Sequence, residues 1–285
     1  MGLPRPVGTA VRLGAALIAF AAAAAAHETE PGGGSDASRA ILRDPAQAMA
    51  YSQQAIGRSV GDHRFTTARG ESFSLASTRG KPLVVNLVYT SCSDACPVTV
   101  QTLARAVDVA RSAVGLDRFN VVIIGFDAHA DSPQRMHDFA RAQGIDVENW
   151  RFLSADAATI ERLSRELGFL AAPRAGGFDH LDQISLIDRD GRVYRQIYGS
   201  EFAPQTLVEP LKLLVFGGDT APTSFAGLLD RVKLLCTVFD PSTGRYRFSY
   251  AIFVEVIAGG LSLAAVGALL LRLWLQARRP LSPRP

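Results

Sequence analysis

The sequence predicts an α/β domain with an amino-terminal β-hairpin, followed by a carboxyl-terminal transmembrane helix. Two observations predict the domain: β-branched runs that suit buried strands, and stretches of helical periodicity between them. A third, an apolar run at 250–271, predicts the membrane helix. The formal net charge of +3 over 285 residues is too small to indicate a nucleic-acid-binding protein.

The amino terminus has the pattern of a secretory signal. Two arginines accompany an apolar run at 13–26 that is short for a membrane span. Small residues before His27 suit signal peptidase, so we expect a signal peptide at 1–26, cleaved after Ala26. The alternative is an uncleaved anchor. Export would place the domain in an oxidising compartment, where a disulfide bond persists.

Residues 27–55 have the composition of a linker. Three consecutive glycines are followed by a polar, alanine-rich stretch with room for one short helix. We expect the folded domain at 56–216. It opens with two short strands that are joined by a turn at Arg69-Gly70.

Strands and helices then alternate. KPLVVNLVYT and NVVIIGFDAH are β-branched runs that suit buried strands in the centre of a sheet. A helix at 97–114 begins with Pro97 in its first turn. The next helix is capped by Ser132 and stops at Gly144.

The second half of the domain continues this pattern. RFLSAD predicts a short strand, and a helix follows at 157–168. QISLIDRDGRVYRQIYG predicts a β-hairpin that turns at Asp190-Gly191, and a helix at 204–216 closes the domain. This order favours one sheet with right-handed crossovers, in a thioredoxin-like layout.

The end of the chain predicts a membrane anchor. We expect a juxtamembrane segment at 217–249, a transmembrane helix at 250–272 and a cytoplasmic tail at 273–285. The span carries one charged side chain, Glu255, before its closing arginine, and further arginines follow it, as is typical of a cytoplasmic end. A buried core helix is the alternative interpretation. Together with the signal peptide, this pattern predicts a domain outside the membrane and a tail inside.

Cys92 and Cys96 are the most informative residues. They stand in YTSCSDACP, where a buried strand gives way to a helix. Open α/β sheets place ligands at such turns, and a helix amino terminus favours thiolates. A spacing of four lets both sulfurs face the same way. The pair suits a redox dithiol that closes a disulfide or a soft-metal site; buried structural thiols are the third possibility.

His180 is the candidate third ligand. It stands in RAGGFDHLDQISLID, which we interpret as a glycine-containing loop before a strand. In a thioredoxin-like sheet this loop passes over the dithiol helix, where an imidazole can complete a sulfur, sulfur, nitrogen site. An ordinary histidine on a surface loop is the alternative.

Three motifs together resemble the SCO/SenC family of copper-binding thioredoxin-like proteins. They are YTSCSDACP, FDAHADSP and FDHLDQISLIDRDGRVYRQIYG, in this order. The resemblance covers about 56–216. It departs from the family pattern at Ser93, where many members have proline, and at His129, where a charged residue is usual.

The resemblance implies a copper metallochaperone with copper ligands Cys92, Cys96 and His180, and with Asp179 supporting His180. It implies a partner as well: the cytochrome c oxidase subunit that carries the dinuclear copper site, together with other periplasmic copper carriers. Thiolates suit Cu(I), and a mixed thiolate and imidazole set also tolerates Cu(II).

A membrane-anchored thiol-disulfide oxidoreductase, which uses Cys92 and Cys96 to keep a partner's cysteines reduced, is the competing function. His180 distinguishes the two, because a simple dithiol reductase has little need of it.

Cys236 stands apart from the pair, just before the membrane helix. We interpret it as a packing residue, with a free thiol or a metal- or haem-associated ligand as alternatives.

Overall fold

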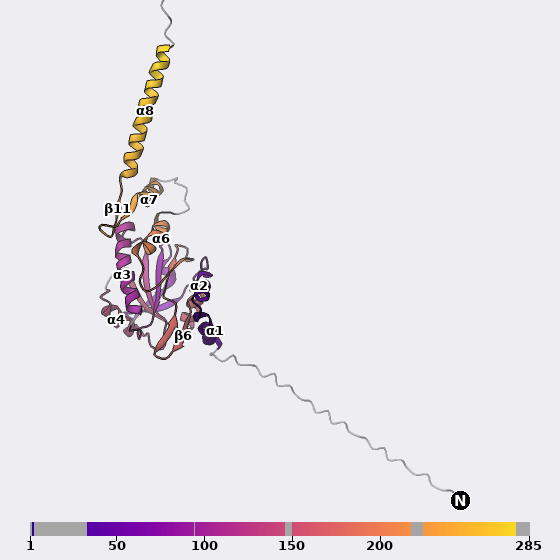
Figure 1. The fold of residues 1–285 in the computed structure, drawn as a ribbon. Helices are drawn as coiled ribbons and strands as arrows, with labels where there is room; N and C mark the ends of the chain where they lie inside the picture. The colour runs from indigo at the N-terminus through magenta and orange to yellow at the C-terminus, as the bar shows by residue number, and fades with distance from the viewer. Residues whose placement is uncertain (1, 3–32, 94, 146–149, 218–224, 278–285) are drawn as a thin grey trace, which may run out of the picture.

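The computed structural model describes residue 2 and residues 33–93, 95–145, 150–217 and 225–277. The predicted signal peptide and most of the predicted cytoplasmic tail lie outside the described residues. A seven-stranded mixed sheet forms the centre of the domain (Figure 1). Its strands lie side by side in the order β2 (Ser72–Ser74), β1 (Arg64–Thr67), β5 (Trp150–Ser154), β4 (Asn120–Gly125), β3 (Leu83–Val88), β8 (Gln183–Ile187) and β9 (Val193–Tyr198).

The centre of the sheet is the most apolar part of the chain. Every residue of β3 is buried, and β3, β4 and β5 run parallel to one another. The outer strands β1, β8 and β9 pair antiparallel with their neighbours. The predicted hairpins β1–β2 and β8–β9 are both present. These features confirm the predicted thioredoxin-like α/β fold.

The helices begin and end close to the predicted signals. Their bounds are η1 (Leu75–Thr78), α3 (Ala95–Val114), α4 (Pro133–Ala142), α5 (Ala157–Leu167) and α6 (Pro204–Phe216). The Ser132 hydroxyl accepts a hydrogen bond from the Arg135 amide and caps α4. Helix α3 buries its apolar positions in the core and packs against α6.

The pairing register defines two edges of the sheet. Leu83, Asn120 and Ile187 lie together where the parallel strands begin, and we call this the amino edge. Val88 and Gly125 lie together where the same strands end, and we call this the carboxyl edge. Because α3 follows β3, its first turn lies near the carboxyl edge.

The amino-terminal segment is more structured than a linker. Helices α1 (Gly33–Leu42) and α2 (Pro45–Gln53) occupy the region in which we expected a tether with one short helix. Ser52 of α2 is buried, and its hydroxyl donates to Gln183 Oε1 at 2.7 Å. Small side chains let α2 lie close to the sheet, and they leave little hydrophobic periodicity in the sequence to indicate that contact.

Two further segments differ from the expected loops. β6 (Ala171–Arg174) and β7 (Gly177–His180) form a small antiparallel sheet where we expected a glycine-containing loop. The juxtamembrane segment contains α7 (Phe225–Cys236) and a hairpin of β10 (Thr237–Asp240) and β11 (Arg245–Phe248).

Helix α8 (Ala251–Ala277) extends away from the domain (Figure 1). Within the described residues, one stretch, Phe253–Gln276, is long and apolar enough to cross a membrane. None of its most apolar window is buried against the domain. This exposure excludes the alternative of a buried core helix in this structure.

Candidate metal centre

The two cysteines lie at the carboxyl edge of the sheet. Cys92 is in the turn after β3, and Cys96 is in the first turn of α3. The Cys96 amide donates a hydrogen bond to Cys92 Sγ at 3.3 Å, so an N–H at the start of the helix faces one sulfur. Both residues are thiols in this structure. The strand-to-helix turn is the one that the sequence predicts.

The environments of the two thiols differ. Cys92 is half-buried, whereas Cys96 is only 2% exposed. Burial raises the pKa of the Cys96 thiol, and the adjacent Cys92 side chain and the Asp182 carboxylate act in the same direction, whereas a hydrogen bond from the Tyr89 backbone opposes them. Cys96 is therefore a neutral thiol near pH 7 without a bound metal, and a metal ion would replace its proton.

Tyr89 supports the first thiol. Its hydroxyl is hydrogen-bonded to the Cys92 side chain and to the Phe178 backbone. Burial raises the pKa of Tyr89, and the bond to Cys92 contributes further, so the phenol stays protonated. A Cβ atom on Gly177 would lie 2.7 Å from the Tyr89 hydroxyl. Glycine at position 177 therefore leaves room for the tyrosine to reach Cys92.

His180 is the last residue of β7, and aromatic rings surround it. Its ring centroid lies 5.9 Å from that of Tyr89, 5.5 Å from Phe126 and 5.8 Å from Phe169. Only 9% of the side chain is exposed. The packing fixes the plane of the imidazole, and a histidine at this position is not an ordinary surface residue.

The polar neighbours of His180 indicate its tautomer. Nδ1 lies 3.3 Å from the Leu181 carbonyl oxygen and 3.7 Å from Asp182 Oδ1. Both neighbours accept hydrogen bonds, so Nδ1 carries the proton in the neutral ring. The lone pair is then on Nε2, the atom with which such an imidazole binds a metal.

The three predicted ligands share one region but are not assembled into one cluster. Cys92, Tyr89 and His180 line the same open cleft, and Cys96 and His180 line a small hollow that adjoins it. Among the described residues, no group of three or more His, Cys, Asp or Glu side chains lies close enough together to hold a metal ion. The sulfurs are adjacent, and the imidazole lies to one side.

The carboxylate beside His180 is not the one that we expected. Asp179 is exposed, and its Oδ1 is 3.1 Å from Arg174 Nε in an ion pair. Successive side chains of a strand point to opposite faces, which directs Asp179 away from the His180 ring. Asp182 is instead the neighbour of the imidazole. The sequence reading missed Asp182, although it stands two residues after the histidine in DHLD.

A buried aspartate holds the loop that precedes the cysteines. Asp131 is 2% exposed, and its Oδ1 accepts hydrogen bonds from the Thr90 amide at 2.8 Å and from the Thr90 hydroxyl at 2.7 Å. Its Oδ2 accepts from the Asp127 amide at 2.9 Å. Burial raises the pKa of Asp131, although these hydrogen bonds oppose the rise. The carboxylate ties the β3–α3 turn to the loop after β4.

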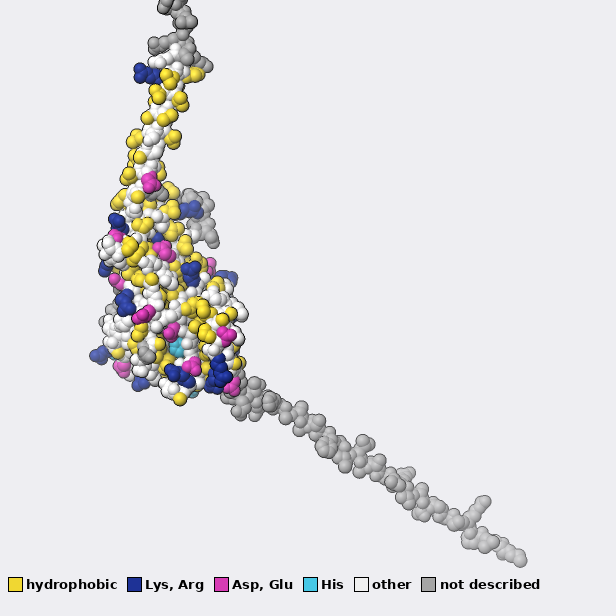
Figure 2. Space-filling view, viewed as in Figure 1, with side chains coloured by type: hydrophobic (Ala, Val, Ile, Leu, Met, Phe, Trp, Pro, Cys, Tyr) yellow, Lys and Arg dark blue, Asp and Glu magenta, His cyan; other side chains and the backbone are white. Residues whose placement is uncertain are grey.

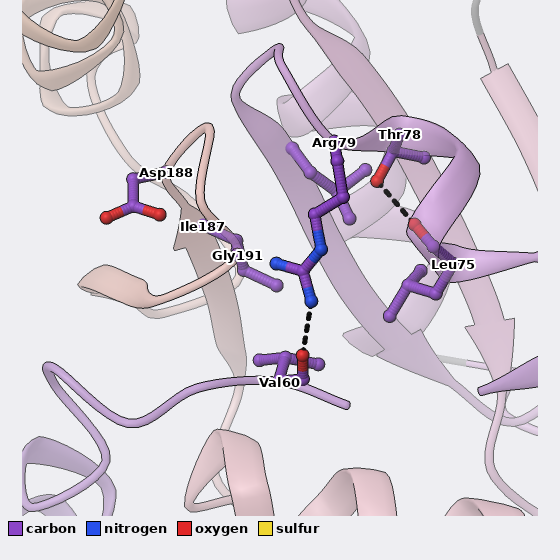
Figure 3. A pocket seen from close by; sticks show the side chains of 8 residues that line it. Val60, Leu75, Thr78, Arg79, Ile187, Asp188 and Gly191 are labelled. Atoms are coloured by element: carbon purple, nitrogen blue, oxygen red, sulfur yellow. Dashed lines mark hydrogen bonds between the residues drawn. The ribbon is translucent and has the colours of Figure 1, made fainter. Parts of the chain in front are cut away.

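A second hollow, at the amino edge of the sheet, contains none of the predicted ligands. Figure 3 shows the Arg79 side chain extending into it, with a hydrogen bond from the guanidinium to the Val60 carbonyl oxygen. A Cβ atom on Gly191 would coincide with the Arg79 guanidinium, and φ of Gly191 is +83°. The arginine fills this hollow and joins three chain segments, which is a structural role.

Cys236 and His27 remain apart from this centre. Cys236 is buried at the end of α7, as a packing residue should be. His27 lies outside the described residues.

Comparisons with known proteins identify a family to which the chain is similar. A family model described as SCO1/SenC matches residues 52–215. The SCO1 protein homolog of Bacillus subtilis (strain 168) is 25% identical over 146 residues, which cover 49% of this chain and 74% of that protein.

Solved structures are also similar to this chain. A SCO1/SenC family lipoprotein from Bacillus anthracis str. Ames aligns with a TM-score of 0.51 and 24% identity, over 55% of this chain and 95% of that one. ScoI of Bradyrhizobium japonicum, solved with copper bound, aligns with a TM-score of 0.46 and 24% identity, over 54% of this chain and 98% of that one.

Proposed function

The chain belongs to the SCO1/SenC family, and on this premise we propose that it is a copper metallochaperone that supports assembly of the dinuclear copper site of cytochrome c oxidase. The observation that carries the proposal is the adjacent sulfur pair at a helix start, with an oriented imidazole on the same cleft. Soft thiolates prefer Cu(I), and an added imidazole makes the set acceptable to Cu(II).

Each residue has a distinct role in this proposal. Cys92 and Cys96 hold the copper cargo as thiolates, and Cys96 releases its proton when the ion binds. His180 supplies Nε2 as the third ligand, with its Nδ1–H held by the Leu181 carbonyl and Asp182. Because the imidazole is not yet within reach of both sulfurs, the β7 end shifts toward them when the cargo is bound.

We propose the location and partner from the same premise. Helix α8 anchors the chain in the bacterial inner membrane, and cleavage of the signal peptide leaves the domain on the periplasmic side. The receiving partner is the oxidase subunit that carries the dinuclear copper site, and other periplasmic copper carriers supply the ion.

Thiol-disulfide exchange is the second candidate function. One observation favours it: Cys92 is half-buried and accepts an amide hydrogen bond at the helix start, while Cys96 lies beside it and is shielded. This is the asymmetry of an attacking and a resolving thiol. His180 has no necessary part in that reaction, so its replacement separates the two functions.

Copper stoichiometry of the reduced full-length chain in detergent tests the proposal. We expect one Cu(I) per chain, loss of tight binding in Cys92→Ser and Cys96→Ser, and weaker Cu(II) binding in His180→Ala. His137→Ala, an exposed histidine on α4, is the matched control. Unchanged Cu(I) binding by both serine variants, or unchanged Cu(II) affinity in His180→Ala, would contradict the assigned site. The second result would favour the dithiol reductase.

A further inference from the structure

The juxtamembrane segment presents an apolar surface that packing in the domain does not explain. Leu228 and Leu235 of α7 are 51% and 69% exposed, and they stand seven residues apart, which places them on one face of the helix. Leu229 of α7 and Val238 of β10 are exposed as well. Leu234 of the same helix packs against the core, so α7 has one face on the domain and another that the described residues leave exposed.

This surface adjoins the start of the membrane helix. The Cys236 carbonyl, at the end of α7, accepts a hydrogen bond from the Ser249 amide at 2.6 Å. Ser249 stands two residues before α8 begins. The end of α7 is therefore fixed beside the point at which the chain enters the candidate span.

Aromatic side chains cluster where the hairpin joins α8. Phe248, Tyr250 and Phe253 contact one another, with ring centroids 5.0 to 6.5 Å apart. Tyr250 is 70% exposed. Aromatic side chains with a polar edge gather at the interface between lipid and water, at the ends of membrane spans.

The charges around the surface favour a bilayer with anionic lipids. Arg231 and Lys233 are exposed on α7, and Arg245 and Arg247 are exposed on β11. Ion pairs join Lys233 to Asp230, Arg247 to Asp240 and Arg245 to Asp108, so basic side chains still outnumber their acidic partners here. Figure 2 shows hydrophobic side chains continuing from α8 onto the adjoining end of the domain, with Lys and Arg nearby. Basic residues close to such a surface are attracted to its anionic headgroups.

We propose that α7 and the β10–β11 hairpin lie on the membrane as an interfacial platform, with Leu228 and Leu235 in the boundary between headgroups and acyl chains. Continuity with α8 selects the bilayer as the occupant of this surface. The inference rests on α8 crossing the membrane and is independent of copper binding.

The platform fixes the direction in which the domain points. Arg118, at the amino edge of the sheet, forms an ion pair with Asp230 of α7 at 3.7 Å. Arg189, in the turn beyond the same edge, donates to the Val215 carbonyl near the end of α6. The amino edge therefore faces the membrane, and the carboxyl edge with the cysteines faces away from it.

Tryptophan quenching by brominated lipids tests the platform in the full-length chain. The chain has two tryptophans, Trp150 in the domain and Trp274 in α8. The test variant combines Trp274→Phe with Leu228→Trp. The control combines Trp274→Phe with Met49→Trp, because Met49 is also exposed and apolar but lies on α2, whose Gln53 side chain donates a hydrogen bond to Tyr198 at the carboxyl edge.

Each protein is reconstituted into nanodiscs of phosphatidylcholine and phosphatidylglycerol, with and without bromine near the headgroup end of the acyl chains. We expect loss of Leu228→Trp emission to the brominated lipid and none for Met49→Trp. Arg231→Gln with Lys233→Gln should reduce the loss. The native chain reports insertion of α8 through Trp274.

The proposal is overturned if Trp274 is quenched while tryptophan at 228 emits as tryptophan at 49 does, because α8 is then inserted and α7 is in water. It is also overturned if Trp274 is not quenched, since the platform requires the span. Neither result bears on copper stoichiometry, which is measured separately in detergent.

Discussion

The two thiols of the site should react at different rates. Cys92 is half-buried, whereas burial hides Cys96 and raises its pKa. A thiol reacts as its thiolate, so a raised pKa leaves Cys96 unreactive at pH 7 to 8 and lets its reactivity increase only as the pH rises toward the shifted value. We expect iodoacetamide to modify Cys92 first in the reduced, metal-free chain.

Peptide mass spectrometry after timed alkylation at several pH values measures this order. Cys236, which is also buried, is the internal control for general unfolding. Faster modification of Cys96 than of Cys92 would show that the assigned exposures are wrong.

Gly177 gives a second test at the level of a single residue. A methyl group there would lie 2.7 Å from the Tyr89 hydroxyl and would displace it from Cys92. We expect Gly177→Ala to lower the free energy of unfolding by about 1–3 kcal/mol, as overpacking does. Alkylation of Cys92 should change in the same variant, because its hydrogen-bond donor has moved.

Thermal unfolding in detergent measures the loss of stability. Tyr89→Phe combined with Gly177→Ala is the matched variant, since it removes the oxygen atom that the methyl group approaches most closely. The combined variant should recover part of the stability lost in Gly177→Ala. Additive losses would mean that the two positions do not interact.

At the scale of elements, the sequence predicted those helices and strands that have a clear hydrophobic pattern or clear residue signals at their ends. Strands β3 and β4 were predicted because they are rich in β-branched residues. Helix α4 was predicted because Ser132 and Pro133 mark its start. One short helix was expected at 27–55, but the packing of α2 on the domain was missed because it uses small residues such as Ala48 and Ser52, which leave a weak pattern. The β6–β7 pair was missed because glycines at 176 and 177 are equally typical of a loop.

The candidate site was predictable only in part. Cysteine spacing places both sulfurs at one turn, because that relationship is local. The distance from His180 to the sulfurs depends on how β7 lies across the carboxyl edge, which is a tertiary property. The exchange of Asp179 for Asp182 beside the imidazole has the same origin, since strand alternation decides it.

A buried cation contributes to the contact between the domain and the juxtamembrane hairpin. Lys212 of α6 is 4% exposed, donates to the Thr237 carbonyl and to Glu209 Oε2, and lies 5.2 Å from the centre of the Tyr246 ring. The Tyr246 hydroxyl in turn donates to Glu209. Burial, followed by the Glu209 carboxylate, raises the pKa of Tyr246, so this phenol remains a donor.

Lys212→Met should therefore loosen the hairpin. It leaves the Thr237 carbonyl without this donor, a loss of about 1–3 kcal/mol of local stability. Hydrogen exchange at the amides of β10 and β11 should accelerate, while β3 and β4 keep their protection. Lys81→Met removes an exposed lysine just before β3 and should change little in the hairpin. Equal protection of the hairpin amides from hydrogen exchange in both variants would show that Lys212 does not stabilise the hairpin.

For the whole molecule, the candidate membrane span and the candidate metal centre are separate. The cysteines lie at the carboxyl edge, and α7 and α8 lie beyond the amino edge. A flexible glycine-serine segment inserted between Ser249 and Tyr250 should leave copper stoichiometry unchanged. If the chain delivers copper to the oxidase as proposed, the insertion should reduce the copper content of the oxidase in cells, because the domain no longer points in one direction.

The same insertion after Pro280, beyond α8, is the control and should have no effect on either quantity. A fall in copper stoichiometry on insertion after Ser249 would show that copper binding depends directly on the connection between the domain and α8. An unchanged oxidase copper content in both variants would show that orientation has no role in delivery.

The opposed edges of the sheet also set a height. Strand β3 runs from Leu83 at one edge to Val88 at the other, a rise of about 17 Å at about 3.3 Å per residue. A domain standing on its platform carries the thiols at least that far above the lipid headgroups. A receiving protein must then hold its empty copper site at a similar distance from the membrane surface, so that the two sites can come into contact. If the receiving site lies at the membrane surface, the domain can reach it only by tilting toward the bilayer.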